Sequence, residues 1–269
     1  MDFKAKLKPL NEEHSIKEAV ISLFLPNKLI KPEQYRDLIK NNFRDDFQQF
    51  QPVNQVKFEI KQGHKQSIIQ TNHNTTIGFR FIGFSDNGNP VKVFQGINEE
   101  NRQFISFHSL NYTRWSEFKK EFFHVLEIFS KESKGIYFEA FSLNYIDIFS
   151  WEDEPDNFKS EYLFQQKSNI LPEVFLNSGF NRSFLVTTEN IEDSLLFNDR
   201  IEIIAKSEVS PEIILNHNSI HKLEDTIEIS EISTNNDFLK RIEIAHDRNK
   251  KFLKDVLSEH ALSLINYQN

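Results

Sequence analysis

Cysteine is missing from this chain of 269 residues, and glycine, with 7 residues, is scarce. Without cysteine there is no disulfide framework, no thiolate metal site and no cysteine nucleophile, which fits a reducing cytoplasm. The few glycines form neither a phosphate-binding loop nor a Gly-x-Ser-x-Gly turn, which excludes P-loop nucleotide hydrolysis. The longest apolar run, residues 19–25, is far shorter than the roughly 20 residues of a membrane-spanning helix. We therefore expect no membrane partner and a cytoplasmic location.

Positive charge is also scarce in the second half. The net charge is −8, but residues 1–72 carry 12 Lys and Arg against 9 Asp and Glu, whereas residues 151–234 carry 6 against 17. An acidic segment repels phosphate backbones, so a nucleic-acid groove is disfavoured there and the first half holds the only candidate basic surface. The acidic residues also fit a solvated face that aids solubility.

Hydrophobic periodicity predicts strand, helix, four strands and helix, followed by the same series again. This order predicts an α+β fold in which two tandem β-α-β-β-β-β-α units share a large antiparallel sheet, with long helices packed on one face. The arrangement would be similar to the TATA-binding or helix-grip type. The units would cover residues 1–134 and 135–269, as two units or one interlocked domain. Expected strands are 15–25, 56–60, 77–84, 91–94, 104–110, 135–149, 182–188, 200–207, 212–216 and 223–232, and expected helices are 31–47, 114–130, 158–175 and 236–265.

Phenylalanine is abundant, with 27 residues. Most must fill the core, but several expected strands place aromatic residues on both faces. If helices cover only one face of the sheet, we expect the other to expose a broad apolar patch, unless a partner subunit covers it.

The expected strand 135–149 is apolar on both faces and contains one carboxylate, Asp147, close to Tyr145 and Asn144. A carboxylate in such a strand must find hydrogen-bond partners or reach a cleft, which makes it a candidate ligand-binding group. The alternative is a polar residue that faces solvent near the end of the strand.

Histidine is the only residue type that hints at a metal. His217 and His221 are four positions apart, but they fall in an expected strand end and turn. No third ligand is evident unless Glu224 or Asp225 folds back, and a catalytic zinc site needs three protein ligands. We expect neither a metal nor another cofactor.

Three stretches, residues 141–148, 112–118 and 244–252, together resemble a sporadically distributed bacterial and archaeal family of similar length with no assigned function. Trp115, Tyr145 and His246 match the motifs of that family. Asn144 stands where the family usually has Arg, and Asp147 where it usually has Asn, so the most conspicuous charge of the motif is missing. The patchy distribution of the family implies an accessory gene, as in phage defence or toxin neutralisation.

Three functions follow as hypotheses. The first is a non-enzymatic binding or regulatory accessory protein that acts through a protein partner, such as the product of a neighbouring gene. The second is a nucleic-acid binder that uses the sheet as a saddle. The third is a small-ligand-binding or hydrolytic protein with a cavity between the sheet and a long helix. The candidate ligand or partner contacts are Trp115, Asn144, Tyr145, Asp147 and His246, and no catalytic residue is assigned.

Overall fold

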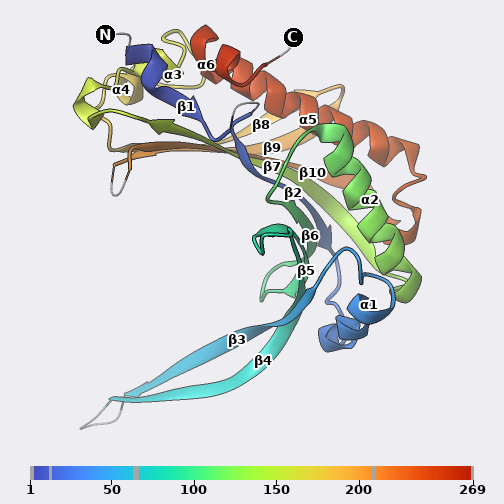
Figure 1. The fold of residues 1–269 in the computed structure, drawn as a ribbon. Helices are drawn as coiled ribbons and strands as arrows, with labels where there is room; N and C mark the ends of the chain where they lie inside the picture. The colour runs from blue at the N-terminus through green and yellow to red at the C-terminus, as the bar shows by residue number, and fades with distance from the viewer. Residues whose placement is uncertain (1–2, 12–13, 63–66, 208–209, 268–269) are drawn as a thin grey trace.

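The computed structural model describes residues 3–11, 14–62, 67–207 and 210–267. The fold is α+β and is built on one open antiparallel sheet of ten strands (Figure 1). The strand order is β3-β4-β5-β6-β2-β7-β10-β9-β8, and β1 pairs with β7. The strands are β1 Leu7–Pro9, β2 Ile16–Leu25, β3 Gln49–Gln62, β4 Ser67–Phe84, β5 Pro90–Asn98, β6 Gln103–Ser109, β7 Tyr137–Trp151, β8 Arg182–Glu192, β9 Leu195–Lys206 and β10 Glu212–Glu228.

The sheet is strongly curved, and the helices lie on its convex face (Figure 1). Two of them are long, and the others have one or two turns. The α-helices are α1 Arg36–Asn41, α2 Trp115–Glu132, α3 Ser160–Leu163, α4 Glu173–Leu176, α5 Asn236–Val256 and α6 Glu259–Leu264. None of the helices that the structure describes lies on the opposite, concave face of the sheet (Figure 1).

The centre of the sheet is the pairing of β2 with β7. The two strands run antiparallel, with Ile21 opposite Leu143 and Ala19 opposite Tyr145. From this central seam the strands of the first half continue outward as β6, β5, β4 and β3, and those of the second half as β10, β9 and β8. The expected strand 135–149 is therefore confirmed as a central strand.

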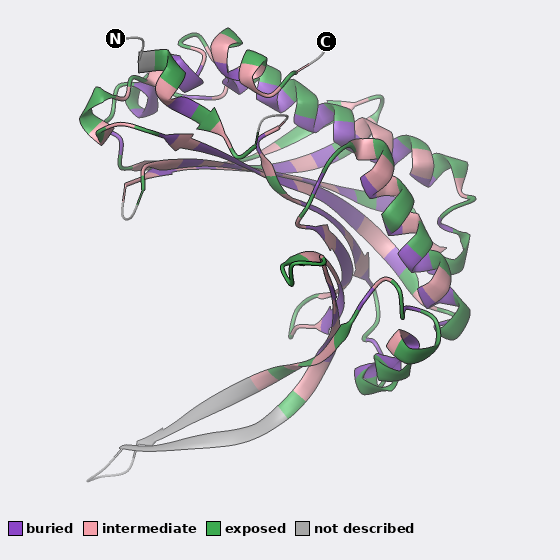
Figure 2. Ribbon diagram, in the orientation of Figure 1, coloured by how far each residue is buried: buried purple, intermediate pink, exposed green. Residues whose placement is uncertain are grey.

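Alternate residues of the strands face the helices and form the core. Under α2 this core is rich in phenylalanine, including the fully buried Phe79, Phe94 and Phe107. A second cluster, around Trp151 and Phe252, lies under the C-terminal helices. Buried residues recur along the central strands and along α2 and α5 (Figure 2). The apolar stripe expected in the 114–130 helix is confirmed as core.

Two of the expected helices are wrong in length. Residues 31–47 form a 3₁₀ turn, Pro32–Tyr35, and the short α1, after which the chain bends so that Phe43 and Phe47 reach the core from a loop. Residues 158–175 form only the single turns α3 and α4. In both segments large aromatic residues are buried without a continuous helix. Their spacing is similar to that of a helix, and this similarity led to the wrong prediction.

The second half has one strand fewer than expected. Residues 212–216 and 223–232 were predicted as separate strands, but β10 runs unbroken through the Asn-His-Asn-Ser segment between them. Buried and partly exposed residues alternate along this segment, so its polar residues belong to a strand and not to a turn. The expected helix 236–265 is also divided, because α5 ends at Val256 and α6 begins at Glu259. Asn235 caps α5 by accepting a hydrogen bond from the backbone N–H of Phe238.

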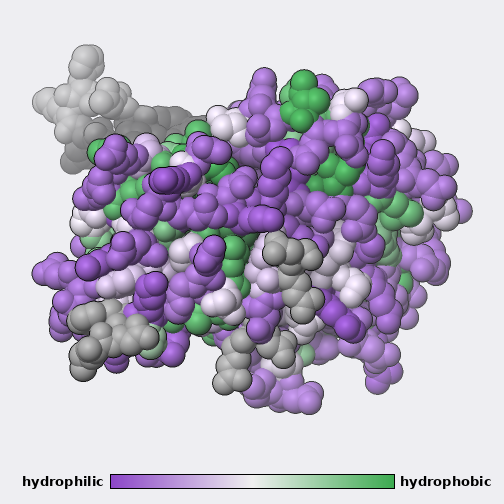
Figure 3. Space-filling model, turned by 90° about the horizontal axis from the view of Figure 1, so that it is seen from above, coloured by the Kyte–Doolittle hydropathy of each residue, from purple (hydrophilic) through white to green (hydrophobic). Residues whose placement is uncertain are grey.

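The broad apolar patch expected on the face without helices stays a prediction. Among the residues whose side chains the structure describes, no phenylalanine is strongly exposed. Seen from above, the surface is mostly hydrophilic, with hydrophobic side chains in small separate patches (Figure 3). The expected alternation of Val56, Phe58 and Ile60 falls on side chains outside the described residues. Within the described ranges, no helix has both the length and the apolar character needed to cross a membrane.

The backbones of β4 and β5 approach closely at Gly78. A Cβ atom at this position would lie 2.2 Å from the carbonyl oxygen of Gly96. We expect Gly78→Ala to lower the free energy of unfolding by about 1–3 kcal/mol, because backbone must move to make room. Gly179→Ala is the matched control, since no heavy atom lies within 4 Å of its Cβ position. Equal urea midpoints for the two variants would contradict the prediction.

Candidate functional site

Three of the five predicted site residues lie together between the sheet and the long helices. The hydroxyl oxygen of Tyr145 on β7 lies 2.9 Å from Nδ1 of His246 on α5. The indole of Trp115, the first residue of α2, stacks on the His246 ring with centroids 4.4 Å apart and planes 8° apart. Residues from three elements therefore meet at one histidine.

These three side chains pack α2 and α5 against the sheet. Burial lowers the pKa of His246 to about 4, with a further contribution from Lys250, so the ring is neutral near pH 7. Trp115 Nε1 donates a hydrogen bond of 2.7 Å to Glu243, which ties α2 to α5. Neither Tyr145, His246 nor Trp115 lines either of the two pockets described below.

Asp147 lies two residues further along β7 on the same face and is 1% exposed. Its Oδ1 accepts a hydrogen bond of 2.7 Å from the hydroxyl of Ser15. Burial raises the pKa of Asp147 to about 6, although Ser15 and His217 act in the opposite direction. The prediction that this carboxylate finds a partner is confirmed, and the alternative of a solvent-facing residue is wrong.

Asn144, the fifth predicted residue, is separated from the others by the sheet. Because side chains alternate along a strand, Asn144 points to the concave face while Tyr145 points to the helices. There it lines a hollow of about 430 Å³, which we call the concave pocket. This pocket crosses the five central strands β6, β2, β7, β10 and β9, and its floor contains Ser142, Asn144, Asn216 and Asn218.

The floor of the concave pocket contains unpaired hydrogen-bonding groups. Asn144 and Asn218 stand opposite each other on β7 and β10, and Asn216 follows on β10. In the part of the chain that the structure describes, Oδ1 of each of these three residues is buried and has no hydrogen-bond partner. Buried polar atoms are paired in most proteins, so three unpaired oxygens on one surface indicate missing partners.

One side of the concave pocket is aromatic. Phe24 and Phe104 have ring centroids 6.4 Å apart, and the guanidinium of Arg102 lies 6.0 Å and 5.4 Å from them. Glu99 accepts a hydrogen bond of 3.1 Å from Arg102. On the opposite side, Arg200 and Glu202 form an ion pair at 3.8 Å.

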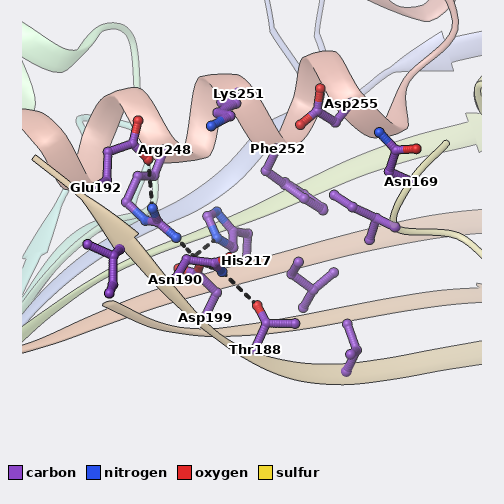
Figure 4. Close-up of a pocket in the computed structure, with 14 residues that line it drawn as sticks. Asn169, Thr188, Asn190, Glu192, Asp199, His217, Arg248, Lys251, Phe252 and Asp255 are labelled. Carbon is purple, nitrogen blue, oxygen red and sulfur yellow. Dashed lines mark hydrogen bonds and ion pairs between the residues drawn. The ribbon is translucent and has the colours of Figure 1, made fainter. Parts of the chain in front are cut away.

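A second pocket, of about 410 Å³, lies on the helix-covered face between α5 and the strands β8, β9 and β10 (Figure 4). We call it the α5 pocket. Its inner end is formed by Asp199, His217 and Arg248, and both His217 and Arg248 contact the Asp199 carboxylate, while Glu192 accepts a hydrogen bond of 2.7 Å from Arg248. Nδ1 of His217 lies 3.1 Å from the amide oxygen of Asn249.

Asp199 is the charged centre of this cluster. Burial alone would raise the pKa of its carboxyl, but the neighbouring His217, Ser219 and Arg248 side chains outweigh that effect and hold the pKa well below its usual range. Asp199 is therefore ionised even well below neutral pH, whereas Asp147, whose hydrogen-bond donor is the neutral Ser15 hydroxyl, ionises only around pH 6.

His217 and His221 both face the helices from β10, and each ring contacts other protein groups. His221 lies 2.8 Å from the carbonyl oxygen of Leu196 and also contacts Arg241. Across the described ranges, no group of three or more His, Asp or Glu side chains is arranged to hold a metal ion.

Sequence reasoning missed Asp199, Arg248, Asn216 and Asn218. Asn216 was expected at the end of the strand 212–216 and Asn218 in the turn after it, although their alternation with His217 and Ser219 indicates one continuous strand. Asp199 and Arg248 are far apart in sequence, and no local pattern connects them.

Comparison of the chain with protein-family models, with curated protein sequences and with solved structures finds no match. The family resemblance therefore stays a prediction, and the site must be interpreted from its geometry.

The raised pKa of Asp147 predicts that Asp147→Asn increases the free energy of unfolding in a pH-dependent way. Because the folded pKa lies above the unfolded value, the wild type loses stability as the pH rises from about 4 to above 6, where the buried carboxyl ionises. We expect the variant to be as stable as the wild type near pH 4 and about 1–3 kcal/mol more stable at pH 7.5 in urea unfolding. Asp199→Asn is the control and should destabilise at pH 7.5, because it removes an ion that Arg248 pairs. A destabilised Asp147→Asn at pH 7.5 would contradict the prediction.

The unpaired amides predict a gain in stability on their removal. Asn218→Leu removes a buried oxygen that has no donor, so we expect the free energy of unfolding to rise by about 1 kcal/mol. Asn98→Leu is the matched control, because the Asn98 amide accepts from the Leu29 N–H at 2.8 Å and donates to the Leu29 carbonyl at 2.9 Å. This control should lose about 1–3 kcal/mol. If Asn218→Leu loses as much as Asn98→Leu, the Asn218 amide is satisfied in the free protein.

Proposed function

We propose that this protein is a non-enzymatic binding protein that holds a protein partner on the concave face of its sheet. The observation that carries the proposal is the row of unpaired amide oxygens of Asn144, Asn216 and Asn218 in the floor of the concave pocket. An unsatisfied buried acceptor costs about 1–3 kcal/mol, and a partner that donates hydrogen bonds would recover this energy on binding. Such a surface is retained for binding, since it does not stabilise the free protein.

The fold supports this use of the sheet. The strand order β2-β6-β5-β4-β3 is followed, on the other side of the seam, by β7-β10-β9-β8. We interpret this as two tandem units, residues 1–134 and 135–269, that form a saddle of the TATA-binding type. The helices cover the convex face, so the concave face is the side on which a partner can lie (Figure 1).

The charges of the concave pocket favour a protein over a nucleic acid. Each arginine of the pocket already has a carboxylate, Glu99 for Arg102 and Glu202 for Arg200. Glu18 lies 2.7 Å from His108. Phosphate backbones are bound by cations that are free to replace counterions. Because both arginines of the concave pocket already have a carboxylate partner, the pocket offers a phosphate backbone little unpaired positive charge.

The aromatic side of the pocket provides an anchor. Phe24, Phe104 and Arg102 combine apolar area with a guanidinium that stacks on it. Aromatic residues and arginine are enriched among the residues that contribute most to protein–protein binding. We therefore place the strongest partner contact at these three side chains and the hydrogen bonds at the asparagine row.

An enzymatic role has weaker support. Tyr145 and His246, the pair most suited to proton transfer, pack α2 and α5 against the sheet and do not line the concave pocket. We propose an accessory role instead, with a partner encoded by a neighbouring gene, in a system such as phage defence or toxin neutralisation.

The test is a native affinity purification with three forms of the chain, followed by mass spectrometry of the proteins, nucleic acids and small molecules retained. The forms are the wild type, Asn218→Arg on the concave face, and Asn177→Arg, a matched change at an exposed asparagine after α4. We expect one protein to be retained by the wild type and by Asn177→Arg, and to be lost with Asn218→Arg. The purified partner should then slow amide hydrogen exchange in β7 and β10.

Other outcomes would overturn the proposal. Retention of nucleic acid in place of protein, with binding that weakens steeply as salt rises, would favour the saddle as a nucleic-acid surface. A partner that binds Asn218→Arg as tightly as the wild type would place the interface elsewhere.

A further inference from the structure

The α5 pocket is not used by the proposed function, and it lies on the other face of the sheet from the concave pocket. Its volume of about 410 Å³ lies within the range of small-molecule sites. It therefore needs its own explanation.

The inner end of the α5 pocket contains a buried anion and a buried cation side by side. The side chains of Asp199 and Arg248 are 4% and 8% exposed, and Arg248 donates a hydrogen bond to Asp199. Oδ1 of Asp199 lies 3.4 Å from Nε2 of His217, whereas Nε of Arg248 has no hydrogen-bond partner within the described ranges. An unused buried donor thus lies beside a buried carboxylate at this end of the pocket.

Additional charges surround this end. Glu192 also pairs with Arg248, so two carboxylates share one guanidinium and leave negative charge that a ligand cation can neutralise. Lys251 on α5 lines the pocket and forms no ion pair with any residue that the structure describes. Its ammonium can form an ion pair with a ligand anion at the rim of the pocket.

Away from this end the pocket has both apolar and polar walls. The apolar walls are Ile170, Val186, Ile201 and Phe252, and in Figure 4 Phe252 points from α5 toward the strands, beside the polar cluster. Asn169, Thr188 and Asp255 also line this part. A ligand with two opposite charges at one end would extend an aliphatic group into this part.

We propose that the α5 pocket binds a small zwitterion whose ammonium and carboxylate groups share one carbon and carry an aliphatic chain, which is the chemistry of an aliphatic α-amino acid. The ammonium lies against Asp199 and Glu192. The carboxylate lies against Nε of Arg248 and the ammonium of Lys251. The aliphatic chain contacts Val186, Ile201 and Phe252, which explains why charged and apolar walls occur together.

The test is isothermal titration calorimetry of the full chain with three probes of similar shape. L-Leucine carries both charges, 3-methylbutylamine lacks the carboxylate, and 4-methylpentanoate lacks the ammonium. We expect L-leucine to bind and each of the other two to bind at least about tenfold more weakly, because each lacks one of the two charged groups that make hydrogen bonds and ion pairs in the proposed site.

Two neighbouring positions of β8 provide the variants. Val186 lines the pocket, whereas Leu185 is 57% exposed and points to the other face of the sheet. Val186→Phe should fill the apolar end and weaken L-leucine binding at least about tenfold, while Leu185→Phe should bind like the wild type. Lys251→Ala, on the exposed side of α5, is a second variant that leaves the core intact and should also weaken binding.

The proposal is overturned if L-leucine does not bind at about 10 mM, a concentration that would detect even weak affinity. It is also overturned if either single-charge analogue binds as tightly, or if Val186→Phe and Lys251→Ala both bind like the wild type. These results do not depend on the concave face, so the partner experiment with Asn218→Arg stands or fails separately.

Discussion

Each central strand of this protein has to satisfy two different environments at once, because its alternate side chains face the helices and the concave surface. In β10, His217, Ser219 and His221 are buried against the helices, whereas Asn216 and Asn218 lie on the open face. A shift of one residue in register would exchange these two sets completely. The phenylalanine core, the asparagine row of Asn144, Asn216 and Asn218, and the α5 pocket all depend on the register of these strands.

Much of the architecture could be predicted from periodicity. The long helix α2, the strands from β4 to β7 and the central place of β7 all follow from patterns within one segment. Prediction failed where a polar run was part of a strand, as in β10, and where aromatic residues reached the core from loops, as with Phe43. In both cases the surroundings that decide the conformation come from distant parts of the chain.

The candidate sites were less predictable than the fold. Tyr145, Trp115 and His246 were grouped correctly but pack helices, whereas Asn144 was grouped with them although it faces the other side. Asp147 and Asp199 illustrate why the spacing of residues in the sequence is insufficient to predict the charge state of a carboxylate. Both are buried aspartates that face the helices, but only Asp199 has an arginine bonded to it, and that arginine comes from a helix much later in the sequence. The charge state of a carboxylate depends on such partners, which no local pattern reveals.

The seam between β2 and β7 also determines when the molecule becomes functional. β2 comes from the beginning of the chain, and its partner follows only after four further strands and α2. Contacts between such distant segments form late, because the entropy of closing a long loop opposes them. During synthesis, β2 therefore has only β6 as a neighbour until β7 has left the ribosome, and the concave surface across the seam does not yet exist. A partner that needs this whole surface would not bind incomplete nascent chains and would bind only molecules that have finished folding.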